Sequence, residues 1–167
     1  MKPNLSKGAL LLIGSPMCSV SSQLQRVNYA RMSREDVEKT IEYGRRHIEF
    51  CMQPYKKQID NGMYFLDEHL TGASSWKLES VKHVETLEGV TKVNSEMCAF
   101  GMTQEQNGES KLVKKPAKFM TNNETIAKRL GRRCNGEHSH VVLLNGRAKR
   151  AEVYPDELCR EITYGLI

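Results

Sequence analysis

At 167 residues, with 39% hydrophobic and 27% charged residues, the chain is long enough for one domain with a sizeable core and has an ordinary globular composition. Its five cysteines are odd in number and irregularly spaced, which argues against a disulfide framework and favours a reducing intracellular compartment, with nucleus and cytoplasm both left open. No apolar run approaches the length of a membrane span, and residues 1–8 lack the pattern of a signal peptide, so no membrane partner is expected.

The net charge of +5 is concentrated in one part of the chain. Residues 111–150 hold eleven Lys and Arg but only two acidic residues, Glu124 and Glu137. A basic block in an otherwise near-neutral chain indicates a surface for a polyanion, and a solvated loop surface is the alternative. The candidate nucleic-acid contacts in this block are Lys111, Lys114, Lys115, Lys118, Arg132 and Arg133.

The first predicted strand covers residues 10–13, an apolar run that Gly14 and Pro16 bring to an end. Short apolar runs of this kind are typical of buried strands in parallel sheets. Cys18 follows in the loop after the carboxyl end of the strand, where open α/β sheets bind their ligands. A small buried thiol without chemistry is the alternative for this cysteine.

A helix is predicted next, with Ser33 as its cap and acidic residues in its first turn. Pro54 should kink or end this helix. Its apolar face, spaced by three and four residues, consists of Val37, Ile41, Gly44, Ile48, Cys51 and Tyr55.

A second strand is predicted at residues 63–66, ending in Asp67-Glu68-His69. Strand, helix and strand form a βαβ unit, whose strands run parallel. The loop with Cys18 and the carboxylate of Glu68 are therefore expected at the same edge of the sheet. A carboxylate in a surface ion pair is the alternative for Glu68.

The remaining elements are predicted from the same signals of periodicity, caps and turns. They are a helix from Ser74 or Ser75 to Gly89, a strand at 90–94, a polar loop at 103–110, a strand at 118–121, a helix from Asn122 or Asn123 through Leu130, a loop at 132–140 and a last helix from Tyr154-Pro155 with Leu158, Cys159 and Ile162 on one side.

Four segments in order resemble one enzyme family. Gly14-Ser15-Pro16-Met17-Cys18 resembles the proline-cysteine loop of DNA cytosine-5 methyltransferases, and Phe65-Leu66-Asp67-Glu68-His69 resembles their Glu-Asn element, with His69 in place of Asn. The family has, later in its sequence, a Tyr-Gly segment and a basic strand, and residues 100–102 with 114–119 resemble a loosened form of these two elements. The tail at 119–159 is similar to the ends of phage-type members. A closer resemblance, over nearly the whole chain, is to domains embedded in retroelement (retrotransposon) polyproteins.

The resemblance implies covalent chemistry on a cytosine base. Cys18 would be the nucleophile that adds to C6, and Glu68 would be the carboxyl group beside N3 that carries or shares a proton. The base must leave the duplex to reach these groups, so a basic surface that binds DNA or another nucleic acid is implied as well.

The resemblance also implies an incomplete protein, because the S-adenosylmethionine half of the family precedes the cysteine strand. The cofactor would then be used only if another segment or chain completes the site. Three interpretations stay open: a fragment, a half that pairs with another chain, and an inactive remnant. The eroded motifs favour a fragment or a remnant, whose partners would include the missing N-terminal half or the rest of a polyprotein.

The expected fold is α/β: an incomplete Rossmann-like, class I methyltransferase-type, three-layer sandwich of about four strands with helices on both faces. Residues 1–167 would form one partial domain, with the cysteine-loop βαβ part at 9–110 and the basic strand, Cys/His loop and C-terminal helix at 111–167. The predicted function is a DNA cytosine-5 methyltransferase-like protein or fragment, inactive alone. The alternative is a non-catalytic nucleic-acid-binding domain of a retroelement-derived polyprotein.

A metal site is a separate hypothesis. Cys134, His138 and His140 are residue types that zinc accepts, although the spacing is not that of a standard finger. Cys98 or Cys159 would supply a fourth ligand. A zinc-stabilised interaction module is thus a third candidate function, and a polar loop with two surface histidines is its alternative.

Overall fold

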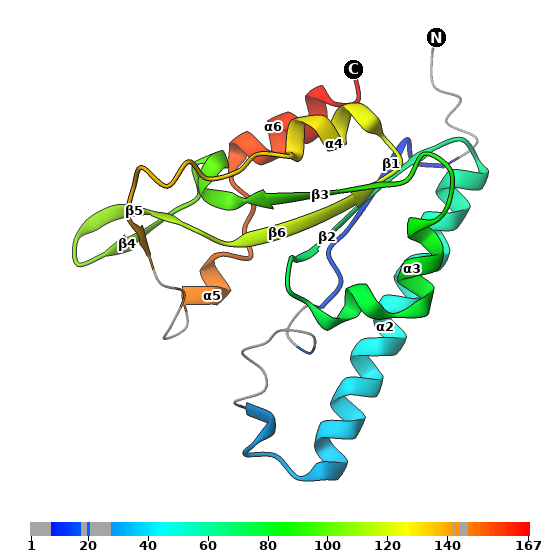
Figure 1. Cartoon of the computed structure of the whole chain (residues 1–167), viewed down its shortest axis with the longest axis horizontal. Helices are drawn as coiled ribbons and strands as arrows, with labels where there is room; N and C mark the ends of the chain where they lie inside the picture. The colour runs from blue at the N-terminus through cyan, green and yellow to red at the C-terminus, as the bar shows by residue number, and fades with distance from the viewer. Residues whose placement is uncertain (1–7, 18–19, 21–27, 142, 144–146) are drawn as a thin grey trace.

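Two β-sheets and the helices around them make up an α/β fold (Figure 1). The structure is a computed structural model, and it describes residues 8–17, 20, 28–141, 143 and 147–167. The larger sheet has the strand order β1-β2-β6-β3, and the smaller has the order β4-β5-β7. No helix among the described residues combines the length and the apolar character that a membrane span requires.

The predicted βαβ unit is confirmed. β1 (Leu11–Gly14) and β2 (Tyr64–Leu70) pair in parallel, and α2 (Arg34–Asp60) connects them. β1 is not the fully buried strand that the apolar run predicts, because it lies at the sheet edge and leaves Ile13 48% exposed. β2 runs past the predicted end, so that all of 65–69, including three polar residues, are buried inside the strand.

The other two strands complete the four expected for this sheet. β6 (Pro116–Thr121) pairs antiparallel with β2 on one side and with β3 (Thr91–Glu96) on the other. β3 is therefore parallel to β2, and one reversed strand separates them. The sheet thus joins residues from both parts of the chain, 9–110 and 111–167.

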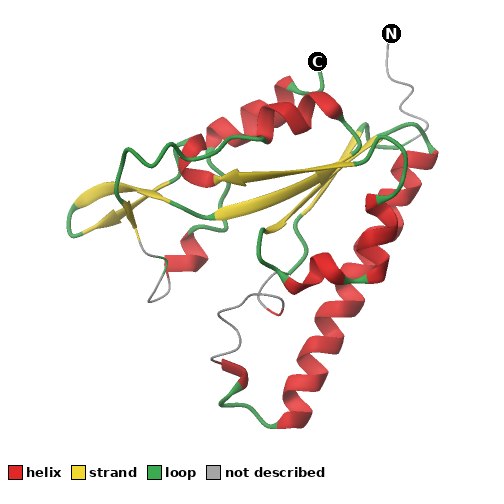
Figure 2. Ribbon diagram, viewed as in Figure 1, coloured by secondary structure: helices red, strands yellow, loops and turns green. Residues whose placement is uncertain are grey.

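Helices cover both faces of the larger sheet, as predicted (Figure 2). On one face, Phe65 and Met120 pack with residues of α2 and of α3 (Glu79–Glu85). On the other face, Leu66 and Phe119 pack with residues of α4 (Glu124–Leu130) and α6 (Asp156–Tyr164). Neighbouring strand residues point to opposite faces, which is why β2 supplies both cores.

The prediction of a polar loop at 103–110 is wrong. This segment belongs to a hairpin of β4 (Thr103–Gln106) and β5 (Glu109–Val113), and β5 also pairs with β7 (His140–Val141). Asn107 and Gly108 form its turn with φ of 56° and 79°, the conformation that an Asn-Gly pair favours in two-residue hairpins. The short polar strands hid this turn signal.

α2 contradicts one of the two outcomes predicted for Pro54: the helix continues through it to Asp60, so Pro54 does not end the helix. The core side of the helix is also shifted, since Ile41 is 47% exposed and Cys51 is only partly buried, while Met52 is in the core. The Ser33 cap is confirmed: its side chain accepts the Asp36 N–H at 3.1 Å.

The remaining helices follow the prediction with local changes. The helix from Ser74 is split into a 3-10 turn, η3 (Ser74–Lys77), and α3. The Asn123 cap of α4 is confirmed. α6 begins after Pro155 as predicted, but Cys159 is exposed and does not share the buried side of Leu158 and Ile162. Two further short helices are η4 (Met97–Phe100) and α5 (Arg147–Arg150).

Gly14 is needed where β1 ends. A Cβ atom there would lie 1.7 Å from the hydroxyl oxygen of Tyr55, which donates a buried hydrogen bond to Asp67 at 2.8 Å. We expect Gly14→Ala to displace this hydroxyl and to lower the free energy of unfolding by about 2 kcal/mol, measured by urea denaturation. Gly131→Ala is the control, because its Cβ would meet nothing closer than 3.5 Å. Equal stability of the two variants would contradict the prediction.

Candidate metal centre and buried carboxylate

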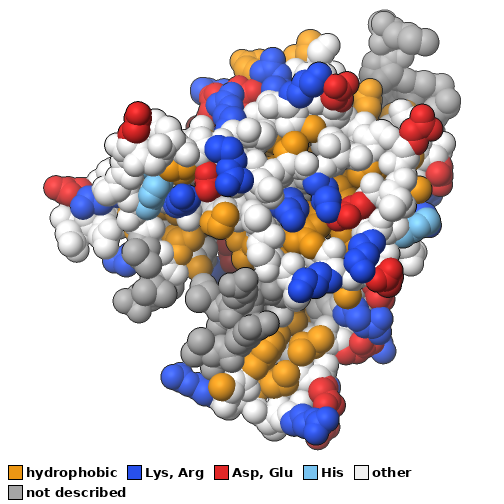
Figure 3. All heavy atoms as spheres, viewed as in Figure 1, with side chains coloured by type: hydrophobic (Ala, Val, Ile, Leu, Met, Phe, Trp, Pro, Cys, Tyr) orange, Lys and Arg blue, Asp and Glu red, His pale blue; other side chains and the backbone are white. Residues whose placement is uncertain are grey.

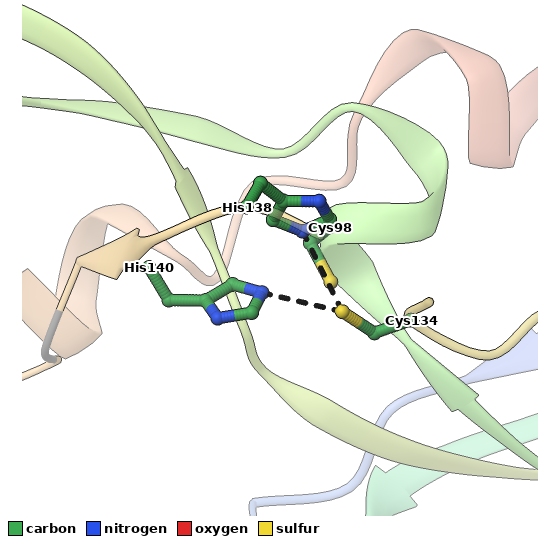
Figure 4. A group of neighbouring side chains, drawn as sticks. All are labelled: Cys98, Cys134, His138 and His140. Atoms are coloured by element: carbon green, nitrogen blue, oxygen red, sulfur yellow. Dashed lines mark hydrogen bonds between the residues drawn. The ribbon is translucent and has the colours of Figure 1, made fainter. Parts of the chain in front are cut away.

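Four side chains of types that bind metals come together where η4, the loop after α4 and β7 meet. They are Cys98, Cys134, His138 and His140, and their ligand atoms all lie within 4.8 Å of one another (Figure 4). This group could hold a metal ion. The Cys134 Sγ lies 3.5 Å from Nε2 of His138 and 3.4 Å from Nε2 of His140. Tetrahedral zinc with its usual bond lengths separates such sulfur and nitrogen atoms by about 3.6 Å, so the spacing fits.

Three different segments bring these ligands together. Cys98 is buried in η4, directly after β3. Cys134 and His138 lie in the loop after α4, and the Gly136 N–H donates to the Cys134 sulfur at 3.3 Å. His140 is positioned by β7, where it pairs with Leu112 of β5. The three predicted ligands therefore lie close together, and the fourth side chain beside them is Cys98 and not Cys159.

Glu96 lies next to this cluster and is almost fully buried. One of its carboxylate oxygens, Oε2, accepts the Cys134 backbone N–H at 2.6 Å. Lys114 Nζ and Arg133 Nε each lie 3.6 Å from its carboxylate. The Cys134 N–H and these cations lower the pKa of Glu96. Burial and the neighbouring Cys134 raise the pKa of Cys98 to about 11, a shift that a bound cation would oppose by favouring the thiolate.

A second polar site surrounds Glu68, which is 4% exposed in β2. Its Oε2 accepts hydrogen bonds from the Ser15 hydroxyl at 2.7 Å and the Tyr154 hydroxyl at 3.2 Å. The ammonium group of Lys115 is 3.5 Å from Oε1, which has no hydrogen-bond donor among the described residues. Burial raises the pKa of Tyr154, which keeps its hydroxyl a proton donor. Cys18 lies outside the described residues, so only Glu68 of the predicted catalytic pair is placed.

The neighbours of Glu68 in β2 are buried as well. Asp67 is 2% exposed, and burial raises its pKa to about 7 despite the Tyr55 hydrogen bond. His69 is 3% exposed, shares a hydrogen bond with Ser75 at 2.8 Å, and has its pKa lowered by burial. Three adjacent ionisable residues buried inside one strand are unusual, and each of them has a hydrogen-bond or ion-pair partner, as buried ionisable groups require.

The six predicted nucleic-acid contacts do not form one free basic strip. Lys115 is paired with the buried Glu68, Lys118 lies over the Trp76 ring, and Arg132 pairs with Glu157 and Glu161. Lys111 is paired with Glu109, and only Lys114 and Arg133 are exposed. On the face shown in Figure 3, basic side chains alternate with acidic ones.

Comparisons with protein-family models, with curated proteins and with solved structures find no match to this chain.

Proposed function

We propose that this chain is a nucleic-acid-binding domain of the DNA cytosine-5 methyltransferase-like type, in which Glu68 contacts an extruded cytosine and which transfers no methyl group by itself. The observation that carries this proposal is the buried Glu68 carboxylate at the edge of the parallel β1–β2 pair. Its Oε1 has an ion pair with Lys115 at 3.5 Å but no hydrogen-bond donor among the described residues.

The pairing register supports this assignment. Gly14 is opposite Asp67, so Glu68 lies one position beyond the end of β1, where Ser15 bonds to it. Ligands of open α/β sheets bind at this edge. A carboxyl oxygen can share a proton with N3 of cytosine or accept from its exocyclic amine, which suits base recognition. Cys18 follows Ser15 by three residues in the sequence and is the proposed nucleophile.

The four-stranded sheet with helices on both faces supports an incomplete Rossmann-like domain. By the same proposal, S-adenosylmethionine would be used only when another segment or chain supplies its binding half. The missing half and the rest of a retroelement polyprotein are the corresponding protein partners.

We also propose zinc as the metal of the Cys98–Cys134–His138–His140 cluster. Two thiols and two imidazoles are a common ligand set for zinc, and four protein ligands leave no open position for catalysis. The zinc would therefore be structural, fixing the loop that carries Arg132 and Arg133.

The second candidate function is nucleic-acid binding with no recognition of a base. The exposed cations Lys114 and Arg133 favour it, because contacts to phosphate alone need no pocket. Equal affinity for duplexes with a matched and with a mismatched cytosine would support this alternative.

Glu68→Gln tests base recognition. We expect the wild-type protein to bind a duplex with one mismatched cytosine about tenfold more tightly than the matched duplex, since a mismatched base is extruded at lower cost. Glu68→Gln should lose this preference and keep its affinity for the matched duplex, measured by fluorescence anisotropy. Glu88→Gln, an exposed residue before β3, is the control. An unchanged preference in Glu68→Gln would refute the proposed contact.

A mechanism-based trap tests the absence of methyl transfer. DNA with 5-fluorocytosine is incubated with the protein, with and without S-adenosylmethionine, and adducts are sought by denaturing gel and mass spectrometry. We expect none from this chain alone. A cofactor-dependent adduct at Cys18 would contradict the proposal and show a working methyltransferase.

A further inference from the structure

We infer that Glu96 has a dual role, in which its one carboxylate positions Cys134 for the proposed metal centre and also partly neutralises the exposed cations Lys114 and Arg133. This inference rests on the proposed function, and it adds a residue that acts on both the metal centre and the phosphate-binding cations.

On the metal side, Glu96 holds the two segments that supply both thiols. It precedes Cys98 by two residues, and its Oε2 accepts the Cys134 N–H at 2.6 Å. Its own backbone N–H donates to the Arg132 carbonyl at 3.1 Å, so the loop before Cys134 is fixed to the end of β3. Residues that orient metal ligands in this way contribute strongly to metal affinity. Glu96 is thus a positioning residue of the centre.

On the nucleic-acid side, Glu96 competes with phosphate. Lys114 and Arg133 both face its carboxylate at 3.6 Å, and they are the exposed members of the six predicted contacts. The carboxylate itself is nearly buried, whereas Arg133 is 61% exposed. A phosphate can therefore reach the cations from solvent while Glu96 subtracts one charge from their attraction for it.

The dual role predicts two effects of opposite sign for Glu96→Gln. Zinc affinity should fall about tenfold, because the charged acceptor that orients Cys134 is lost. At saturating zinc, affinity for DNA should rise about three- to tenfold, with a salt dependence up to about one unit steeper, because Lys114 and Arg133 lose their anion. A general structural fault would instead lower both affinities.

The experiment measures both affinities on the full chain. Zinc affinity is measured by competition with a chromogenic chelator, and DNA affinity by anisotropy of a fluorescein-labelled single strand at several salt concentrations. Glu137→Gln is the matched control, since this exposed glutamate of the same loop bonds to Asn135 and touches neither the cluster nor the two cations among the described residues, so it should change neither value.

Opposite shifts in Glu96→Gln, with none in Glu137→Gln, are the expected result. A fall in both affinities, or no change in either, would overturn the dual role of Glu96 while leaving the proposed function in place. Absence of DNA binding in the wild-type protein would instead overturn the proposed function, and absence of zinc binding would overturn the metal assignment; either result would remove the dual role as well.

Discussion

Cys98→Ser is expected to abolish stoichiometric zinc binding and to lower the free energy of unfolding by about 4 kcal/mol when free zinc is about a thousandfold above its dissociation constant. The reason is that the cluster exists only in the folded chain, where η4, the loop after α4 and β7 meet. Metal binding is then coupled to folding, so the lost binding energy appears as lost stability.

Cys159→Ser is the matched control for this prediction. Cys159 is exposed on α6 and has no place in the cluster, so its replacement should leave zinc content and stability unchanged. Metal content is measured by native mass spectrometry and stability by urea denaturation with defined free zinc. One zinc per chain in Cys98→Ser, or loss of zinc in Cys159→Ser, would contradict the assignment of the fourth ligand.

Asp67→Asn is expected to stabilise the protein at pH 8 by about 2 to 4 kcal/mol and to have little effect near pH 4. Burial raises the pKa of Asp67 to about 7, so the folded chain holds a proton that the unfolded chain releases near pH 4. The stability contributed by this proton is complete below about pH 4 and is lost as the pH rises to about 7. Asparagine stays neutral throughout and can still accept the Tyr55 hydrogen bond.

The measurement is the free energy of unfolding between pH 4 and pH 8. The wild-type protein should lose stability across this range relative to Asp67→Asn. Asp60→Asn, an exposed carboxylate at the end of α2, serves as the control and should follow the wild-type curve. Parallel curves for wild type and Asp67→Asn would show that Asp67 titrates normally.

Elements with a strong local signal were predictable. The Ser33 and Asn123 caps and the start of α6 follow from residues a few positions apart. The parallel β1–β2 pair joins distant residues, and it was predictable because a strand, a helix and a strand in succession normally form a parallel unit. The β4–β5 hairpin was missed because its strands are short and polar, and the pairing of β5 with β7 joins segments that no local pattern relates. Of the two outcomes predicted for Pro54, an end of the helix is wrong, because α2 continues to Asp60.

The two candidate sites differ in how many of their residues could be predicted from the sequence alone. Cys134, His138 and His140 lie within seven residues, so their pattern was visible, but Cys98 is brought to them only by the tertiary fold. The contacts of Glu68 with Tyr154 and Lys115 likewise join distant segments, and no local pattern marks Tyr154. The basic block was misleading in detail, since contacts that depend on the fold engage all six of its candidate residues, and Lys114 and Arg133 are the two of the six that stay exposed.

The most direct test of the central claim, nucleic-acid binding, is a salt titration of the zinc-loaded protein with a labelled single strand and a labelled duplex. We expect binding to both at 50 mM salt, with affinity that falls linearly in the logarithm of salt concentration and a slope of about −1 to −2, the value for contacts by Lys114 and Arg133. No binding to either DNA at 50 mM salt, with zinc in place and the chain folded, would contradict the account.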